Sequence, residues 1–241
     1  MTSVRAVDRA IDILEAIAAA PEGVKITQLQ SDTGIARPTL YRLVRTLESR
    51  NLLRQCDDPT RYALDLGILA LAQPCMRAID TLSHADTVLD DLAAAVEETV
   101  ALCIFRGATR IFVREILSPH ALKYSVGVGT TEPILRGAGG HAILAYLDAT
   151  TRNQLLETVG DAERQQLTVE LEHVQKRGYA VSEGQILDGA TAIAAPVFDR
   201  IGKVTGSVGV YGPSVRLSGD RIAPTAATLL AHTRRISEQA P

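Results

Sequence analysis

The chain has 241 residues, of which 46% are hydrophobic and 22% are charged, and its formal net charge is −3. This length allows one large domain or two modest ones with buried cores. The longest uncharged runs, 204–215 and 222–233, are shorter than the roughly 20 apolar residues of a membrane span, and charged residues interrupt the N-terminus where a secretory signal is apolar. We therefore expect a cytoplasmic protein with no membrane partner. Taken alone, the acidic balance argues against nucleic-acid binding.

The N-terminal pattern predicts a winged helix-turn-helix over residues 1–66. Apolar residues at spacings of three and four predict a helix over 4–18 with Ser3 as its N-cap. A second short helix, capped by Thr27, turns at Gly34, and a third runs over 38–50 with Pro38 in its first turn. The short segments 52–55 and 61–64 flank a turn-forming sequence and predict the hairpin that we call the wing.

A helical linker over 67–85 and a sensor domain over 86–241 are expected to follow. Pro74 is expected to break or kink this segment after Gln73, because proline removes a backbone donor and clashes with the preceding turn, and a first helix is expected over 66–73. The sensor pattern predicts an α+β domain built on an antiparallel sheet. Its expected helices span 86–98, 139–147, 151–159, 163–177 and 220–237, and its expected strands span 99–105, 110–116, 122–126, 190–198 and 203–211.

Charge is unevenly distributed in the predicted helix-turn-helix. Residues 1–66 hold nine basic and nine acidic side chains, but residues 36–55 hold five arginines against Glu48 alone. Such a cluster on the third helix is typical of phosphate binding, although it could also be a solvated basic face. The start of a recognition helix reaches base edges, which favours Arg37, Thr39 and Tyr41 as base readers. Phosphate contacts are expected from the arginines farther along the helix and on the wing, Arg42, Arg45, Arg54 and Arg61.

A glycine-rich turn is the candidate effector site of the sensor. Gly137, Ala138 and Gly139 open an apolar helix whose free N–H groups favour an anion, and Arg136 precedes them. We expect Tyr124, Ile193, Val208 and Tyr211 to supply walls and a hydroxyl group. The alternative is that the glycines only allow close packing and that Arg136 is a surface residue.

Catalytic and metal chemistry is weakly supported. Gly137-x-Gly139-x-x-Ala142 with Glu157 about 20 residues on matches a dinucleotide fingerprint, but 151–159 reads as helix where a second parallel strand is required. Three widely spaced cysteines and five histidines without an i, i+4 pair predict no metal site. We expect no cofactor and no catalytic residues, and an NAD-dependent or other metabolic enzyme with an appended helical domain is the alternative.

Several blocks of the sequence resemble the IclR family of bacterial transcriptional regulators over nearly the whole chain. In the N-terminal half these blocks are 5–14, Thr33-Gly34-Ile35-Ala36-Arg37-Pro38-Thr39-Leu40-Tyr41-Arg42-Leu43 and Arg61-Tyr62-Ala63-Leu64. In the C-terminal half they are 137–142, Arg177-Gly178-Tyr179-Ala180 and Ile193-Ala194-Ala195-Pro196-Val197-Phe198-Asp199.

The resemblance implies a homodimer or dimer of dimers that binds double-stranded operator DNA, as repressor or activator, and senses a small organic molecule through a GAF-like domain. That molecule is commonly a carboxylate. Gly209 and Tyr211 stand where related sensors often carry serines, and Ala192 and Ser182 replace a frequent cysteine and a frequent aspartate. These four positions line the pocket in relatives, so they complete the expected effector site. The resulting hypothesis is a transcriptional regulator controlled by an organic acid, possessing no enzymatic activity.

Overall fold

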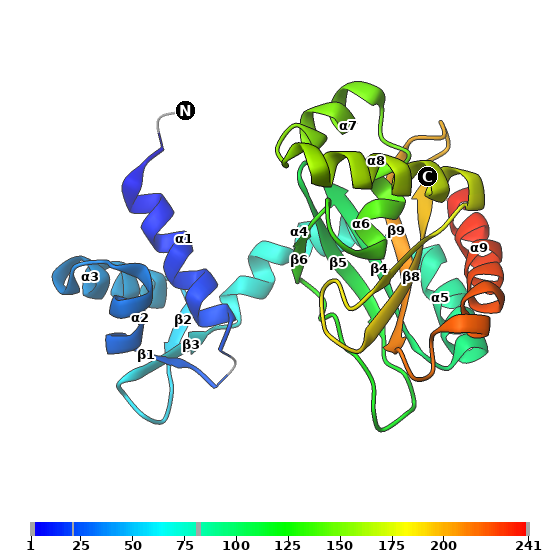
Figure 1. Ribbon diagram of the computed structural model, residues 1–241. Coiled ribbons are helices and arrows are strands. Elements are labelled where there is room, and N and C mark those ends of the chain that lie inside the picture. The colour runs from blue at the N-terminus through cyan, green and yellow to red at the C-terminus, as the bar shows by residue number, and fades with distance from the viewer. Residues whose placement is uncertain (1–2, 21, 81–82, 240–241) are drawn as a thin grey trace. The chain divides into compact units, whose positions relative to one another are not determined.

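The computed structural model describes residues 3–20, 22–80 and 83–239 (Figure 1). The chain divides into two compact units, residues 1–78 and 79–241, and the division falls inside the segment expected to be the linker. None of the helices in the described ranges is long and apolar enough to cross a membrane.

The first unit is a winged helix-turn-helix, as predicted. Its elements are α1 (Arg5–Ala18), β1 (Val24–Lys25), α2 (Ile26–Thr33), α3 (Arg37–Ser49), β2 (Leu53–Gln55) and β3 (Arg61–Leu64). The three strands pair antiparallel in the order β1-β3-β2, so β1 adds a strand that the sequence pattern did not predict. Ile13, Leu29, Leu40 and Val44 are buried in one core that joins the three helices.

Helix ends in this unit follow the sequence prediction only in part. Gly34 adopts the left-handed conformation with φ +64°, which confirms its predicted place at the turn. Val4 rather than Ser3 is the N-cap of α1, because the Ser3 hydroxyl bonds to the Asp8 carboxylate. Thr27 lies inside the first turn of α2 and does not cap it. Both capping predictions are therefore wrong.

The helix that begins after the wing continues through Pro74. It is α4 (Gly67–Asp80), so the predicted helix end at Gln73 is wrong, while a kink at Pro74 stays a prediction. A proline inside a helix removes the bond to the carbonyl four residues before it, here that of Ala70. Both residues are exposed, so water can satisfy that carbonyl while the residues around Pro74 remain helical.

The second unit is built on a six-stranded antiparallel sheet in the order β6-β5-β4-β9-β8-β7. The strands are β4 (Thr99–Arg106), β5 (Thr109–Ile116), β6 (Thr131–Pro133), β7 (Ala180–Glu183), β8 (Ala190–Phe198) and β9 (Val204–Pro213). Residues alternate between its faces, which produces two separate cores. Val208 and Val210 pack in one core, while Ala194 and Cys103 pack in the other.

Helices cover both faces of this sheet (Figure 1). The first core is closed by α5 (Ser83–Val96) and α9 (Ile222–Glu238), and the second by α6 (Gly137–Leu144) and α8 (Asp161–Arg177). Helix α7 (Ala149–Leu156) precedes α8, and the short 3-10 helix Gly219–Arg221 precedes α9. This arrangement confirms the expected α+β class.

Two sheet edges differ from the prediction. Residues 122–126 form no strand, because side chains rather than a neighbouring strand satisfy this backbone. The Thr99 hydroxyl donates to the Tyr124 carbonyl at 2.6 Å, and the Val126 N–H donates to the Glu115 carboxylate at 2.6 Å. The edge strands are instead the short β6 and β7, which the sequence pattern did not reveal.

Candidate functional site

Helix α3 presents its basic side chains away from the core of the first unit. Leu40, Val44 and Leu47 are buried, whereas Arg37, Arg42 and Arg45 are exposed. Pro38 occupies the first turn, where the missing N–H costs no helical bond. The helix therefore presents three exposed arginines on the faces that do not pack against the core.

The other predicted base readers are less exposed than Arg37. Thr39 and Tyr41 are half-buried, and Tyr41 packs against the core of this unit. The guanidinium carbon of Arg37 lies 5.7 Å from the centroid of the Tyr41 ring, a cation–π contact that holds the arginine at the start of α3.

The two arginines of the wing are placed differently from each other. Arg54 is exposed on β2. Arg61 is half-buried, and its Nη1 donates to the Gly23 carbonyl at 2.9 Å while its Nε lies 3.8 Å from the Asp58 carboxylate. Hydrogen bonds from Thr60 lower the pKa of that carboxyl. Arg61 thus braces the wing through Nη1 and Nε, and the phosphate contact expected of it stays a prediction.

A cavity of about 150 Å³ lies in the second unit beside the start of α6. Seven of the eleven residues expected at the effector site line it: Tyr124, Gly137, Ala138, Gly139, Ser182, Ala192 and Tyr211. The Ala138 N–H donates to the Ser182 hydroxyl at 3.1 Å, which links the first turn of α6 to β7. Segments far apart in the sequence thus meet around one cavity.

The remaining expected residues do not line this cavity. Ile193 and Val208 point into the core under α5 and α9, because neighbouring residues on a strand face opposite sides of the sheet, so the prediction for them is wrong. Gly209 lies beneath the Tyr211 side chain, where a Cβ would come within 2.5 Å of the hydroxyl oxygen. Arg136 is exposed and does not line this cavity, so the prediction that it belongs to the effector site is wrong for this cavity.

Arg110 of β5 is the principal cavity residue that sequence reasoning missed. Its side chain is fully buried, and Nη1 donates to the carbonyls of Pro133 at 3.2 Å and Arg136 at 2.7 Å. Nη2 is bonded to the Glu132 carboxylate, which also lines the cavity. Burying an arginine in this way is tolerated because its charge is paired and most of its donors are used.

The glycines at the start of α6 make room for this guanidinium group. A Cβ at Gly139 would lie 3.3 Å from Nε of Arg110, and one at Gly137 would lie 3.3 Å from Nη2. A Cβ at Gly140 would collide with Nη1 and with the Ile134 carbonyl. Close packing is therefore one reason for the glycine run, in addition to the N–H groups that it leaves at a helix start.

Two buried polar atoms of residues that line the cavity have no partner among the described residues. They are Nε of Arg110 and the hydroxyl of Tyr211. Burial raises the pKa of Tyr211, so its hydroxyl stays protonated and can donate. An unpaired buried donor costs about 1–3 kcal/mol, so a molecule that supplied acceptors here would gain affinity.

The loop that carries Tyr124 is held over the sheet by a buried ion pair. Nε and Nη2 of Arg216 contact the two Glu98 carboxylate oxygens at 2.5 and 2.8 Å, and Nη2 also donates to the Leu122 carbonyl at 2.9 Å. The Glu98 side chain is only 7% exposed. The pair therefore ties the loop that carries Tyr124 to the residue just before β4.

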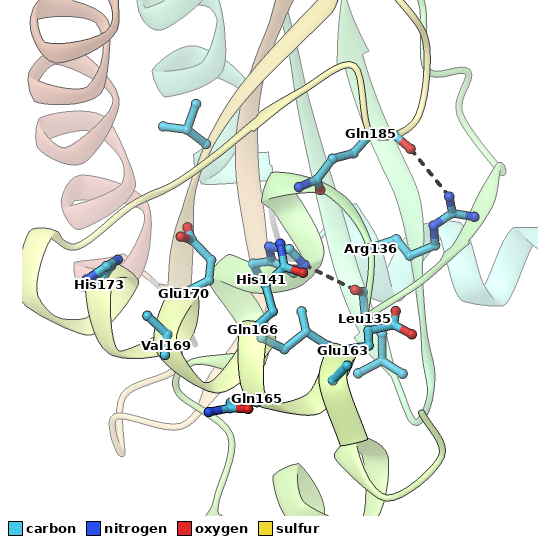
Figure 2. Close-up of a pocket in the computed structure, with 13 residues that line it drawn as sticks. Leu135, Arg136, His141, Glu163, Gln165, Gln166, Val169, Glu170, His173 and Gln185 are labelled. Atoms are coloured by element: carbon cyan, nitrogen blue, oxygen red, sulfur yellow. Dashed lines mark hydrogen bonds between the residues drawn. The ribbon is translucent and has the colours of Figure 1, made fainter. Parts of the chain in front are cut away.

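A larger and more open groove of about 880 Å³ lies beside α8 (Figure 2). Arg136 belongs to this groove, where its Nη2 approaches the Gln185 carbonyl at 3.5 Å. His141 also lines it, with Nε2 bonded to the Leu135 carbonyl at 3.1 Å and Nδ1 buried without a partner among the described residues. Within the described ranges, no group of three His, Cys, Asp or Glu residues is placed to hold a metal ion.

His141 makes the stability of the protein depend on pH. Burial lowers the pKa of His141, and the hydrogen bond to Leu135 and the charge of Glu170 only partly oppose this shift. The unfolded chain therefore binds a proton below pH 6.5 that the folded protein rejects, so stability falls as pH decreases, by up to about 1.4 kcal/mol per pH unit. Urea unfolding should show that the free energy of unfolding decreases less between pH 7.5 and pH 5.5 for His141→Gln than for the wild type. Equal losses would rule out this assignment.

Comparisons with known proteins agree with this architecture. The model for the helix-turn-helix domain of IclR matches residues 6–57, and the model for the C-terminal domain of the bacterial transcriptional regulator IclR matches residues 73–238. The HTH-type transcriptional regulator KdgR of Escherichia coli (strain K12) is 26% identical over 245 residues, covering 98% of this chain and 93% of that protein. The transcriptional repressor IclR of the same organism is 22% identical, covering 97% and 89%.

Solved structures share the fold. An IclR transcriptional regulator from Alicyclobacillus acidocaldarius superposes with a TM-score of 0.84 at 23% identity, covering 100% of both chains. Pseudomonas aeruginosa HmgR gives 0.77 at 26% identity, covering 98% of this chain and 99% of that one.

These matches and the two units define a transcriptional regulator with a DNA-binding helix-turn-helix and a C-terminal effector-binding domain. The chain belongs to the IclR family, and it is not an enzyme. The dinucleotide fingerprint fails structurally as well, because the strand pairs of the sheet are antiparallel and Glu157 directly follows α7 rather than a strand.

Proposed function

We propose that this regulator binds double-stranded operator DNA through α3 and the wing, and that a small organic acid in the cavity controls that binding. The observation that carries the first part is the exposure of Arg37, Arg42 and Arg45 on a helix whose other face is buried. Arginine suits this task because it stays charged and pairs bidentately with phosphate or guanine.

Within α3, position along the helix separates the proposed roles. Arg37 stands at the N-terminal end, the part of a recognition helix that reaches base edges, and is our proposed base reader with Thr39 and Tyr41 beside it. Arg42 and Arg45 follow along the helix and are proposed to contact phosphates, together with Arg54 of the wing.

The proposal of an organic acid rests on the groups that line the cavity. Gly137 and Ala138, in the first turn of α6, form part of the cavity wall, and the positive end of the helix dipole lies at this turn. Arg110 and Tyr211, each with a buried donor that has no partner among the described residues, line the same cavity. Control then requires that the acid bind the DNA-competent and DNA-incompetent states with different affinity.

We further propose that the working form is a homodimer or a dimer of dimers. Three large apolar side chains of the α1 segment, Val4, Val7 and Ile11, are 65%, 55% and 46% exposed and recur at helical spacing. An apolar stripe of this kind on a helix favours burial against a second copy. Two helix-turn-helix domains in one assembly would also read two half-sites, which a single small domain cannot do.

Replacing Val7 with aspartate should dissociate this assembly. A charge in the apolar stripe must be desolvated on association, so sedimentation equilibrium at micromolar concentration should give a smaller mass for Val7→Asp than for the wild type. Val169→Asp is the matched control, because Val169 is also about half exposed but lies on α8. A wild-type monomer, or two variants of unchanged mass, would contradict the proposed interface.

Selection of bound fragments from the source genome tests the DNA-binding proposal directly. We expect the full chain to enrich a small set of fragments sharing one sequence, and to bind them more weakly as salt increases. Failure to enrich any sequence would overturn the proposed operator binding, whatever the effector is.

A further inference from the structure

The Nε of Arg110 and the Tyr211 hydroxyl lie close to the same point, beside Gly139 at the start of α6. The two atoms lie 3.3 and 3.5 Å from the position that a Gly139 Cβ would occupy. Arg110 is 1% exposed, and both atoms lack a hydrogen-bond partner among the described residues. Both residues line the cavity.

The surroundings hold both side chains in place. Nη1 of Arg110 is fixed by two backbone carbonyls and Nη2 by Glu132, so the guanidinium group cannot turn away from the cavity without losing three bonds. The Tyr211 ring packs edge-on against Phe112 with centroids 6.1 Å apart, over a glycine at position 209 that leaves room for its hydroxyl. The two donors are therefore organised before any ligand arrives.

The chemistry of these two groups specifies the complementary atom. An arginine nitrogen can only donate, and the protonated phenol can donate as well, so the occupant must present acceptors. A carboxylate offers two acceptor oxygens and charge-assisted bonds, and the adjacent N-terminus of α6 favours its charge.

Building on the proposed function, we propose that Arg110 and Tyr211 determine effector specificity by binding the carboxylate of a small monocarboxylic acid. The cavity of about 150 Å³ matches the size of an engineered cavity that takes benzene, so one ring or a short branched chain fits. Val126, Ile186 and Leu187 supply apolar contacts for that part. Glu132 disfavours a second negative charge beside Arg110.

Matched acids and amides test this assignment. The full chain would be titrated calorimetrically with benzoate, phenylacetate and isobutyrate and with the corresponding primary amides. We expect at least one acid to bind and its amide to bind at least tenfold more weakly. Tyr211→Phe, which removes one oxygen atom, should weaken that acid about tenfold, and Arg110→Lys, which keeps the charge but loses Nε, should abolish measurable binding.

Two controls separate this proposal from simpler explanations. Tyr146→Phe makes the same change outside the cavity and should leave acid affinity unchanged. Enrichment of genomic fragments by each variant without ligand reports on folding and on the proposed DNA binding. If fragments are enriched but no acid binds, if amides bind equally well, or if both cavity variants retain wild-type affinity, the Arg110–Tyr211 assignment is wrong while the proposed DNA binding stands.

Discussion

Replacing Arg42 with alanine will weaken binding to the operator and to random duplex DNA alike, by about tenfold at moderate salt. The reason is that a phosphate contact carries no sequence information, and each neutralised phosphate adds about −0.9 to the slope of log affinity against log salt. The slope for Arg42→Ala should therefore be shallower by about one. Fluorescence anisotropy over a salt series measures both quantities.

Two matched variants show whether this effect belongs to α3. Arg106→Ala removes another exposed arginine, this one from the sensor, and should change neither affinity nor slope. Arg37→Ala should lose about 1–3 kcal/mol on the operator and much less on random DNA, because a base contact supplies discrimination. If Arg42→Ala and Arg37→Ala both bind as the wild type does, α3 is not the reading helix.

Replacing Arg216 with alanine will destabilise the sensor by about 2–3 kcal/mol, because a buried carboxylate is left without its partner. The value lies below the usual range for buried pairs because the Arg216 side chain is 28% exposed and water can replace part of the interaction. Urea unfolding followed by circular dichroism would measure the loss.

Arg235→Ala is the control for this prediction. Its ion pair with Asp91 is about half exposed on both sides, so its removal should cost less than about 1 kcal/mol. Equal losses for the two variants would mean that burial of Glu98 does not govern the stability of this loop.

Local sequence patterns correctly predicted the helices and the hairpin of the first unit. Glycine at position 34 meets the left-handed conformation that a sharp helix turn requires, and the turn-forming residues 56–60 do join two strands. The two N-cap predictions failed because capping depends on which hydrogen-bond partner a side-chain hydroxyl reaches in the folded chain. Ser3 finds the Asp8 carboxylate, an alternative that a list of N-cap preferences does not weigh.

The sensor site was harder to predict because its residues meet only through the sheet. Ala192 and Ile193 were both expected at the pocket, although strand neighbours face opposite sides and only Ala192 lines it. Arg110 gave no local signal, since a basic residue near the start of a strand is usually solvated. The one sequence feature that pointed to a buried arginine was the set of three glycines within 137–140. In the folded chain these glycines leave the space that the Arg110 guanidinium group requires.

The most direct test of the central claim is operator affinity measured with and without a saturating acid that binds the cavity. Coupling between effector and DNA sites typically amounts to about 5–150-fold. We predict a shift in this range for the wild type, in either direction, and none for Arg110→Lys at the same acid concentration. Unchanged operator affinity of the wild type with the cavity filled would contradict control of DNA binding through this site.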